Sequence, residues 1–381
     1  MSLVLALASL ILIALVLVDA FEAVLSPRRV TRPYRPIRFF YMTTWAVWRL
    51  MAMRIRAPRR RATFLSLFGP LSLLALFGTW VAGLIVSFAV LAWSLGATIQ
   101  ATSHEQIGLG GYLYLSGVTF FTLGFGDLTP TGPYGRLLAV FEAGVGYAFL
   151  AAMLGYLPVL YQAYARRELM ISLLDARAGS PPSAGQLLLR MAQSRNVAVV
   201  DSFLAELERW AAELLESHLS FPMLGLYRSQ HDNQSWLAAL TTTLDTCALV
   251  MAAVKDVNVY QAQLTFAMAR HAAVDLGLVV NLRPQAPEQD RLDCERCAKL
   301  HAALAAAGLS LRDAPVVEQK LTELREMYEP FVNALSERYL FALPPIFAEQ
   351  STVDNWQTSA WTRRTPGIGK LILDDRDEHF A

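Results

Sequence analysis

Residues 111–133 read G-Y-L-Y-L-S-G-V-T-F-F-T-L-G-F-G-D-L-T-P-T-G-P, and this stretch decides the fold of the chain. Ten or eleven apolar and hydroxyl residues lead into T-L-G-F-G-D at residues 122–127. The apolar part is too short to cross a bilayer, because a spanning helix takes about 20 residues. Non-helical backbone at membrane depth is tolerated only where it is buried in protein or lines a cavity. We therefore predict a re-entrant half-helix over residues 111–121, followed by non-helical backbone.

The glycines after this half-helix suit a site for a dehydrated cation, which needs oxygen atoms in place of its water. Successive carbonyls can point to one side only if alternate residues adopt unusual φ and ψ, and glycine does so without steric cost. Gly124 and Gly126 supply those positions. If four chains meet, the carbonyls of residues 122–125 stack into consecutive rings. We expect Leu123 and Phe125 to point outward, and the partly negative end of the half-helix to face the central cavity.

The stretch resembles the filter of the potassium-channel pore family, whose pattern is T-[VIL]-G-[YF]-G-D. The six filter residues match this pattern in order: Thr122, Leu123, Gly124, Phe125, Gly126 and Asp127. Thr119 occupies the place of an upstream hydroxyl, and residues 127–130 fit the turn into the inner helix. Phe125 is a departure, because tyrosine is commoner there and its hydroxyl can brace the filter.

This resemblance covers residues 64 to about 164, roughly a quarter of the chain. It implies the bacterial type of two-helix pore, with an outer helix, a re-entrant pore helix, a filter and an inner helix. It also implies a homotetramer with K⁺ as the permeant ion, and it places a hinge of the inner helix near Gly146.

Long apolar runs flank the filter stretch and predict membrane spans. Residues 64–95 carry no charge, and residues 137–164 carry only Glu142. Residues 2–25 form another apolar run, which contains Asp19 and Glu22. A signal peptide is the alternative for this first run, but no basic residue precedes Arg28. We therefore expect an extra N-terminal transmembrane helix over residues 1–25.

The segment between the first two spans, residues 26–63, is basic and interrupted by prolines. The positive-inside rule places it in the cytoplasm, with the N-terminus outside and everything after Arg166 inside. Residues 39–53 are aromatic and amphipathic, which favours a helix lying in the membrane interface over a solvated loop. We expect an integral protein of the cell (inner) membrane. Its basic segment contains eleven arginines and no acidic residue up to position 61: Arg28, Arg29, Arg32, Arg35, Arg38, Arg49, Arg54, Arg56, Arg59, Arg60 and Arg61.

The last span contains two glycines and one acidic residue that are candidates for a role in the pore. Gly144 and Gly146 either form a hinge, because glycine weakens a helix, or allow close helix packing. Glu142 is the one acidic residue of the span, and such residues in membranes are usually functional. It either bonds a pore-helix hydroxyl or amide behind the filter or faces the cavity as a cation site.

Composition limits what the whole chain can be. Of its 381 residues 54% are hydrophobic and 17% charged, whereas soluble domains carry about 25% charged residues. This excludes a disordered chain and argues against an ordinary soluble enzyme. The net charge of +1 gives no case for nucleic-acid binding. After a pore domain at residues 64–165, we expect a linker at 166–185, a cytoplasmic helical domain at 186–343 and an irregular tail at 344–381. The last helical stretch of this domain is expected at residues 316–343.

Two groups in the helical domain are candidates for binding. Cys294, Cys297 and His301 have a spacing that suits a metal, but a zinc site needs a fourth ligand, and we predict no metal. The polar residues 227–236 are either a regulatory ligand or subunit site around His231 and Asp232, or a helix start capped by Asp232 or Asn233.

Together these observations predict an all-α membrane protein, namely a pore-loop channel with an extra N-terminal transmembrane helix and a cytoplasmic helical domain. We expect a tetrameric potassium-selective channel, with no catalytic residues, no cofactor and no nucleic-acid partner. A weakly selective cation channel is one alternative. A membrane-anchored signalling or scaffold protein with a silent pore is the other.

Overall fold

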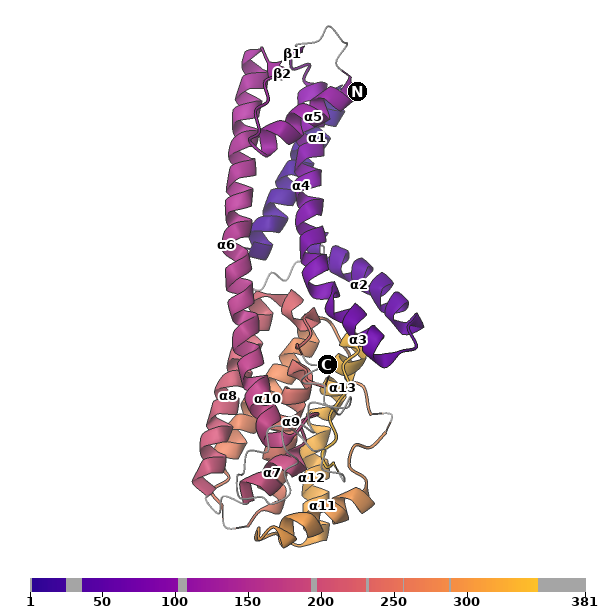
Figure 1. The fold of residues 1–381 in the computed structure, drawn as a ribbon, viewed down its shortest axis with the longest axis vertical. Helices are drawn as coiled ribbons and strands as arrows, with labels where there is room; N and C mark the ends of the chain where they lie inside the picture. The colour runs from indigo at the N-terminus through magenta and orange to yellow at the C-terminus, as the bar shows by residue number, and fades with distance from the viewer. Residues whose placement is uncertain are drawn as a thin grey trace, which may run out of the picture. The chain divides into compact units, whose positions relative to one another are not determined.

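A computed structural model of the chain describes residues 2–24, 36–101, 108–192, 197–230, 233–255, 257–287 and 289–348. The described residues are mostly helical, as expected for an all-α membrane protein (Figure 1). The chain divides into two compact units, Met1–Gln162 (unit 1) and Ala163–Ala381 (unit 2). One long helix, α6 (Pro133–Ala178), has residues in both units.

Unit 1 contains the expected membrane spans. Three helical segments that lie wholly or partly in this unit are long and apolar enough to cross a membrane, and each overlaps one of the three spans expected from the sequence: Leu3–Val24, Pro58–Ser94 and Pro133–Ala178. The helices of this unit before α6 are α1 (Ser2–Val24), α2 (Pro36–Arg54), α3 (Pro58–Ser66), α4 (Phe68–Ser94) and α5 (Leu109–Phe120).

The apolar faces of α1 and α4 pack against each other, and Asp19 is buried beside them. Gly83 of α4 lies beside Val16 of α1, where a Cβ would make an ordinary contact of 3.6 Å. The Asp19 carboxylate accepts hydrogen bonds from the indole Nε1 of Trp80 at 3.0 Å and from the backbone N–H of Ile37 at 3.3 Å. Asp19 therefore joins α1 both to α4 and to the first turn of α2.

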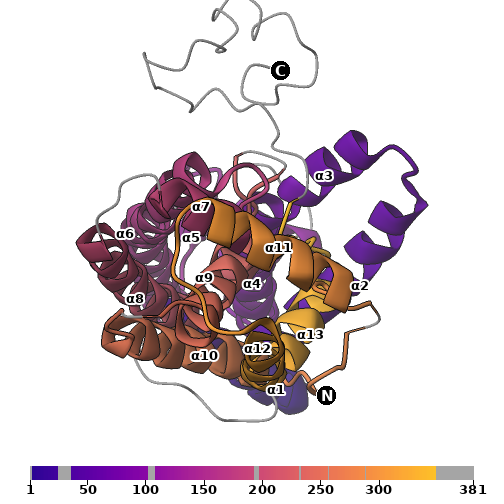
Figure 2. The ribbon, with the colours of Figure 1, turned by 90° about the horizontal axis from the view of Figure 1, so that it is seen from below.

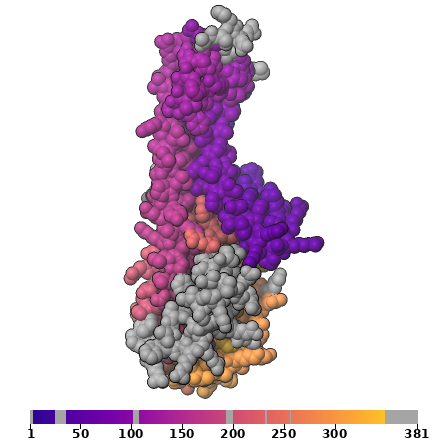
Figure 3. Space-filling model, viewed as in Figure 1, coloured from indigo at the N-terminus to yellow at the C-terminus, as the bar shows by residue number. Residues whose placement is uncertain are grey.

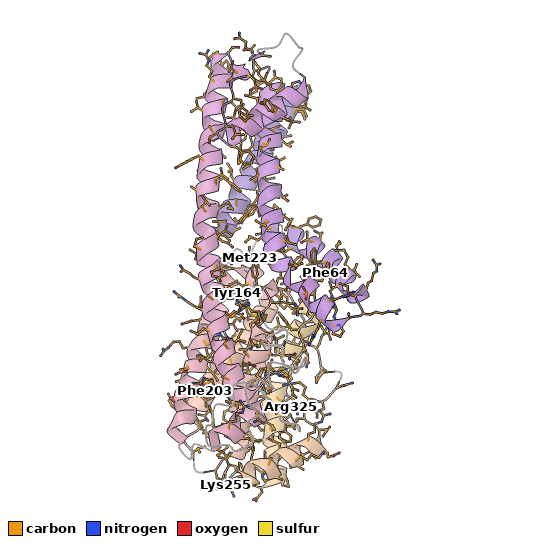
Figure 4. The ribbon with its side chains drawn as sticks, viewed as in Figure 1. Phe64, Tyr164, Phe203, Met223, Lys255 and Arg325 are labelled. Carbon is orange, nitrogen blue, oxygen red and sulfur yellow. The ribbon has the colours of Figure 1, made fainter. Side chains whose placement is uncertain are left out.

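Helix α2 confirms the helix expected at residues 39–53, and aromatic rings pack it against α3 and α4. The Trp48 ring stacks on Phe64, labelled in Figure 4, with ring centroids 4.3 Å apart. Trp45 meets Phe68 edge-on at 4.9 Å. Pro58 starts α3 in its first turn, where the missing N–H costs nothing.

Two short strands frame the filter stretch. Strand β1 (Ile99–Ala101) pairs antiparallel with β2 (Leu128–Pro130), and Gln100 lies opposite Thr129. This ladder was not predicted from the sequence. It fixes the backbone that leaves the filter before α6 begins.

Unit 2 is a helical domain built around α9. Figure 2 shows α9 among its neighbouring helices. By length and composition α9 could also cross a membrane, but 94% of its apolar window is buried inside the protein. Its surroundings are therefore protein, and it is a core helix. The elements of the unit after α6 are α7 (Ala184–Ala192), α8 (Val197–Ser220), the 3₁₀ helix η1 (Pro222–Leu226), α9 (Trp236–Ala253), α10 (Tyr260–Val279), α11 (Cys294–Ala306), α12 (Ala314–Glu326) and α13 (Glu329–Tyr339).

Charged side chains are part of the unit 2 core. The Arg291 guanidinium donates to both carboxylate oxygens of Asp245, at 2.8 and 2.9 Å, and to Glu329 at 2.8 Å. Arg325, labelled in Figure 4, donates to the Glu329 and Asp290 carboxylates. Buried cations are thus paired with carboxylates, as burial of charge requires. This network joins α9, the segment before α11, α12 and α13.

Two expectations about unit 2 are corrected. The linker expected at 166–185 is wrong in its first half, because α6 continues to Ala178 and buries Ile171 and Leu174 in the core of unit 2. These apolar positions recur at helical spacing, and the helix ends before Gly179 (φ +87°), a usual terminating residue. The single helix expected at 316–343 is two helices, because Pro330 starts α13 in its first turn.

Candidate ion-conduction site

The pore helix α5 ends in a hydrogen-bond pattern that turns the chain sharply. Leu123 N–H donates to the Val118 carbonyl at 2.8 Å, and Thr122 N–H donates to the Thr119 carbonyl at 3.0 Å. Thr122 between them has φ +57°. This is a Schellman motif, in which the left-handed position is usually glycine. Threonine there stores about 1–2 kcal/mol of backbone strain.

Positive φ then recurs at alternate residues. Thr122 has φ +57°, Gly124 +61° and Gly126 +82°. The special backbone that the sequence predicts at Gly124 and Gly126 is therefore present. Thr122 was expected to contribute a hydroxyl and a carbonyl, and its left-handed conformation was not anticipated. Left-handed residues alternating with ordinary ones are the arrangement needed for successive carbonyls to face one side.

In a single chain this stretch is open on one side. Residues 121–127 are all exposed, including the large apolar side chains of Leu123 (55%) and Phe125 (66%). Exposed apolar groups of this size in a strained segment indicate a surface completed by other protein. One chain by itself therefore leaves these residues exposed.

The stretch from Asp127 to the start of α6 is held by hydrogen bonds. The side chains of Tyr114 on α5 and Asp127 are hydrogen-bonded to each other. The Arg136 Nε donates to the Pro130 carbonyl at 3.3 Å, and the Tyr112 hydroxyl donates to the Ala97 carbonyl at 2.7 Å. The sequence did not single out Tyr114, because nothing local to this tyrosine indicates that it contacts Asp127.

Behind the filter, a carboxyl group joins three helices. Glu142 on α6 is 5% exposed and is hydrogen-bonded to the Ser116 hydroxyl on α5. Ser116 also bonds the Ile85 carbonyl of α4 at 2.8 Å. This confirms the pore-helix hydrogen bond, one of the two interpretations of Glu142. Thr119 lines the small cavity beside this group, of about 20 Å³.

Gly144 and Gly146 of α6 have different surroundings. A Cβ built on Gly146 would lie 2.1 Å from the Phe120 carbonyl oxygen, whereas a Cβ on Gly144 would meet nothing within 4 Å. Gly146 therefore lets α6 contact the end of the pore helix. The hinge role stays a prediction, and α6 is helical through both glycines and through Pro158.

The part of α6 in unit 2 is anchored by Arg167. This buried guanidinium donates to the carbonyls of Leu224 at 2.8 Å and Tyr227 at 3.0 Å. The Trp210 indole donates to the Arg167 carbonyl at 3.2 Å. Nothing local in the sequence shows that Arg167, which follows Arg166 after the last span, is buried.

Of the other candidates, His231 and Asp232 lie outside the described residues. The capping residue of α9 is Ser235, whose hydroxyl accepts from Ala238 N–H at 3.0 Å, so the cap expected at Asp232 or Asn233 is wrong. Ser235 is favoured because it directly precedes the first helical residue.

The cysteine pair of α11 has protein partners. The Cys294 thiol donates to Glu318 at 3.0 Å, and His301 Nε2 lies 2.9 Å from the Arg312 carbonyl. Among the described residues, no three His, Cys, Asp or Glu side chains are grouped so as to hold a metal ion.

The geometry of unit 1 and the comparisons with known proteins agree on a class. Residues 74–162 match the model of the family described as ion channel. This segment holds most of α4, the pore helix, the filter and the first part of α6. It confirms the resemblance to the two-transmembrane pore family, and the protein is an all-α integral membrane protein with an ion channel domain.

A curated relative extends beyond this domain. The uncharacterized membrane protein YdjJ of Bacillus subtilis (strain 168) is 28% identical over 181 residues, which cover 46% of this chain and 52% of YdjJ. The chain thus matches about half the length of that relative. No solved structure matches this chain significantly.

Proposed function

We propose that the protein is a homotetrameric channel that selects K⁺ and conducts it passively. The observation that carries this proposal is the alternation of positive φ at Thr122, Gly124 and Gly126 within the sequence T-L-G-F-G-D. Carbonyl oxygens that face one side can replace the hydration shell of a cation. No covalent bond is made or broken, so the protein needs no catalytic group.

Four copies are proposed because one chain leaves the filter open. With four chains around an axis, the exposed side of residues 121–127 faces the axis and the neighbouring subunits. The apolar Leu123 and Phe125 then pack between subunits and hold the rings of carbonyls at a fixed width. A fixed width matters because K⁺ and Na⁺ differ in the size of oxygen cage they prefer.

The proposed orientation follows the arginines. The basic segment and unit 2 lie in the cytoplasm, and the β1–β2 ladder with Asp127 lies outside. We assign the opening and closing of the pore to the inner helix α6. The residues of α6 after position 162 belong to unit 2 and are held there by Arg167. Movement of unit 2 would therefore act on the pore through a continuous helix.

The test is ion flux through the purified full-length protein in liposomes. Gly124→Ala should abolish K⁺ flux, because a Cβ at φ +61° costs about 1–2 kcal/mol in each subunit and turns the carbonyl. Gly117→Ala is the matched control, since Gly117 lies within α5 and a Cβ there meets nothing within 4 Å. Phe125→Tyr should keep or sharpen the preference for K⁺ over Na⁺.

The outcomes separate the alternatives. Normal flux through Gly124→Ala would show that residues 122–127 are not the permeation path. Equal K⁺ and Na⁺ flux through the unmodified protein would favour a weakly selective cation channel. No flux in any condition, with an intact tetramer, would favour a scaffold with a silent pore.

A further inference from the structure

Helix α2 is apolar on the side that faces away from the protein. Trp45 and Ala52 are buried against α3 and α4. On the opposite side Phe39, Met42 and Leu50 are exposed, with Phe39 71% exposed. Residues 39, 42, 46, 50 and 53 recur at helical spacing and form one stripe along the helix. A water-soluble surface helix would carry polar side chains there.

The turn between α2 and α3 has the opposite character. Five exposed arginines lie at the end of α2, in the turn and in the first turn of α3: Arg54, Arg56, Arg59, Arg60 and Arg61. No acidic residue occurs between residues 36 and 66, so the charged residues of the segment are all basic. In addition, the buried Nε of Arg49 on α2 has no hydrogen-bond partner among the described residues.

The α2–α3 hairpin, residues 36–66, is attached at both ends to spans. Asp19 of α1 bonds the first turn of α2, and α3 is followed directly by α4 (Figure 3, indigo). The hairpin is therefore held at the level where α1 and α4 end. An apolar stripe beside an arginine cluster at that level faces the boundary between acyl chains and headgroups.

We propose that the α2–α3 hairpin docks on anionic phospholipid. The apolar stripe enters the acyl boundary, as in interfacial helices. The arginines of the turn bind headgroup phosphates, because the planar guanidinium donates two parallel hydrogen bonds to one phosphate. The charges fit this occupant, since the hairpin contains seven arginines and no acidic residue, and the cytoplasmic leaflet carries negative charge.

The experiment measures lipid affinity and does not depend on ion flux. The detergent-purified full-length protein is titrated with phosphatidylglycerol or phosphatidylcholine, each labelled on the acyl chain, and anisotropy reports binding. The wild type should bind phosphatidylglycerol more tightly. Arg56→Gln, Arg60→Gln and Arg61→Gln together should lower that affinity roughly 100-fold, at about fivefold per charge. Affinity for phosphatidylcholine should stay unchanged.

A matched control removes the same charge elsewhere. Arg209, Arg283 and Arg296 are exposed arginines of unit 2, and their joint substitution by Gln should leave both affinities unchanged. Replacement of Arg56, Arg60 and Arg61 by Lys keeps the charge and should retain most of the preference, which separates loss of charge from misfolding.

Several results would overturn the proposal. Equal binding of the two lipids by the wild type would mean that the hairpin has another occupant, such as a protein. An equal loss in the unit 2 control would make the preference a matter of net charge. Complete competition by inorganic phosphate, at constant ionic strength, would identify a site for free phosphate.

Discussion

Alanine at Gly146 should disrupt the pore, because this glycine is where the inner helix meets the end of the pore helix. A Cβ there would lie 2.1 Å from the Phe120 carbonyl oxygen and 2.9 Å from its carbonyl carbon. Neither atom belongs to a flexible side chain. An ordinary contact is about 3.4 Å or more, so α6 and the end of α5 must separate by roughly 1.3 Å.

Two effects of the substitution oppose each other. Overpacking of a close contact costs about 1–3 kcal/mol. Alanine in place of glycine favours a helix by about 1 kcal/mol. We expect a net loss of up to about 2 kcal/mol per subunit, together with a shift of the Schellman turn at Thr122. Since that turn positions the first carbonyl of the filter, K⁺ flux should fall as well.

Gly144 is the matched control, two residues earlier on the same helix. A Cβ there meets nothing within 4 Å, so Gly144→Ala should be neutral or stabilise by up to about 1 kcal/mol. The measurement is the thermal dissociation of the purified tetramer, followed by size-exclusion chromatography, with K⁺ flux in liposomes. A Gly146→Ala protein that melts at or above the wild-type temperature and conducts normally would refute the packing argument.

Three further predictions concern buried or paired side chains. Glu142→Gln should keep near-normal flux, because the amide can make the same hydrogen bond to the pore helix. Glu142→Leu should instead lower the dissociation temperature, because it removes a hydrogen bond worth about 1–3 kcal/mol. Equal behaviour of the two variants would contradict this role of Glu142. Burial, together with the charge of Arg167, lowers the pKa of His218 to about 3. The unfolded chain takes up this proton below pH 6.5 and the folded chain does not, so unit 2 should lose about 2 kcal/mol of stability between pH 7 and pH 5. Urea unfolding followed by tryptophan fluorescence should show this loss, and His218→Gln should remove most of it; an unchanged pH dependence would refute the assignment. The Glu318 carboxylate, by its hydrogen bond and its charge, raises the pKa of the Cys294 thiol. Glu318→Gln should therefore speed alkylation of Cys294 at pH 8, because more of the thiol is then the reactive thiolate. An unchanged rate would argue against the contact.

The filter and the spans could be predicted from the sequence because their signals are local. The six residues 122–127 are consecutive, and the need for left-handed backbone at Gly124 and Gly126 follows from glycine itself. The three membrane spans could be predicted by counting the consecutive apolar residues in each run. The arrangement of α5 between two spans then followed from its shortness.

Other features depended on residues far apart in the chain. Glu142 could be assigned to a pore-helix hydrogen bond, but the choice of Ser116 and the link to Ile85 required the packed helices. The resemblance singled out Gly146 as a hinge, but its close contact with Phe120, which Gly144 lacks, could be found only in the packed structure. The burial of Arg167 was likewise invisible, because a positive charge after a span is normally in water.

Helix α9 shows the same limit most clearly. Its 18 residues are apolar enough to cross a membrane, as are those of α1. Local composition determines that both helices avoid water, because most of their side chains are apolar. The tertiary structure decides what covers them: α9 is enclosed by helices of its own unit, whereas much of α1 remains open to other surroundings.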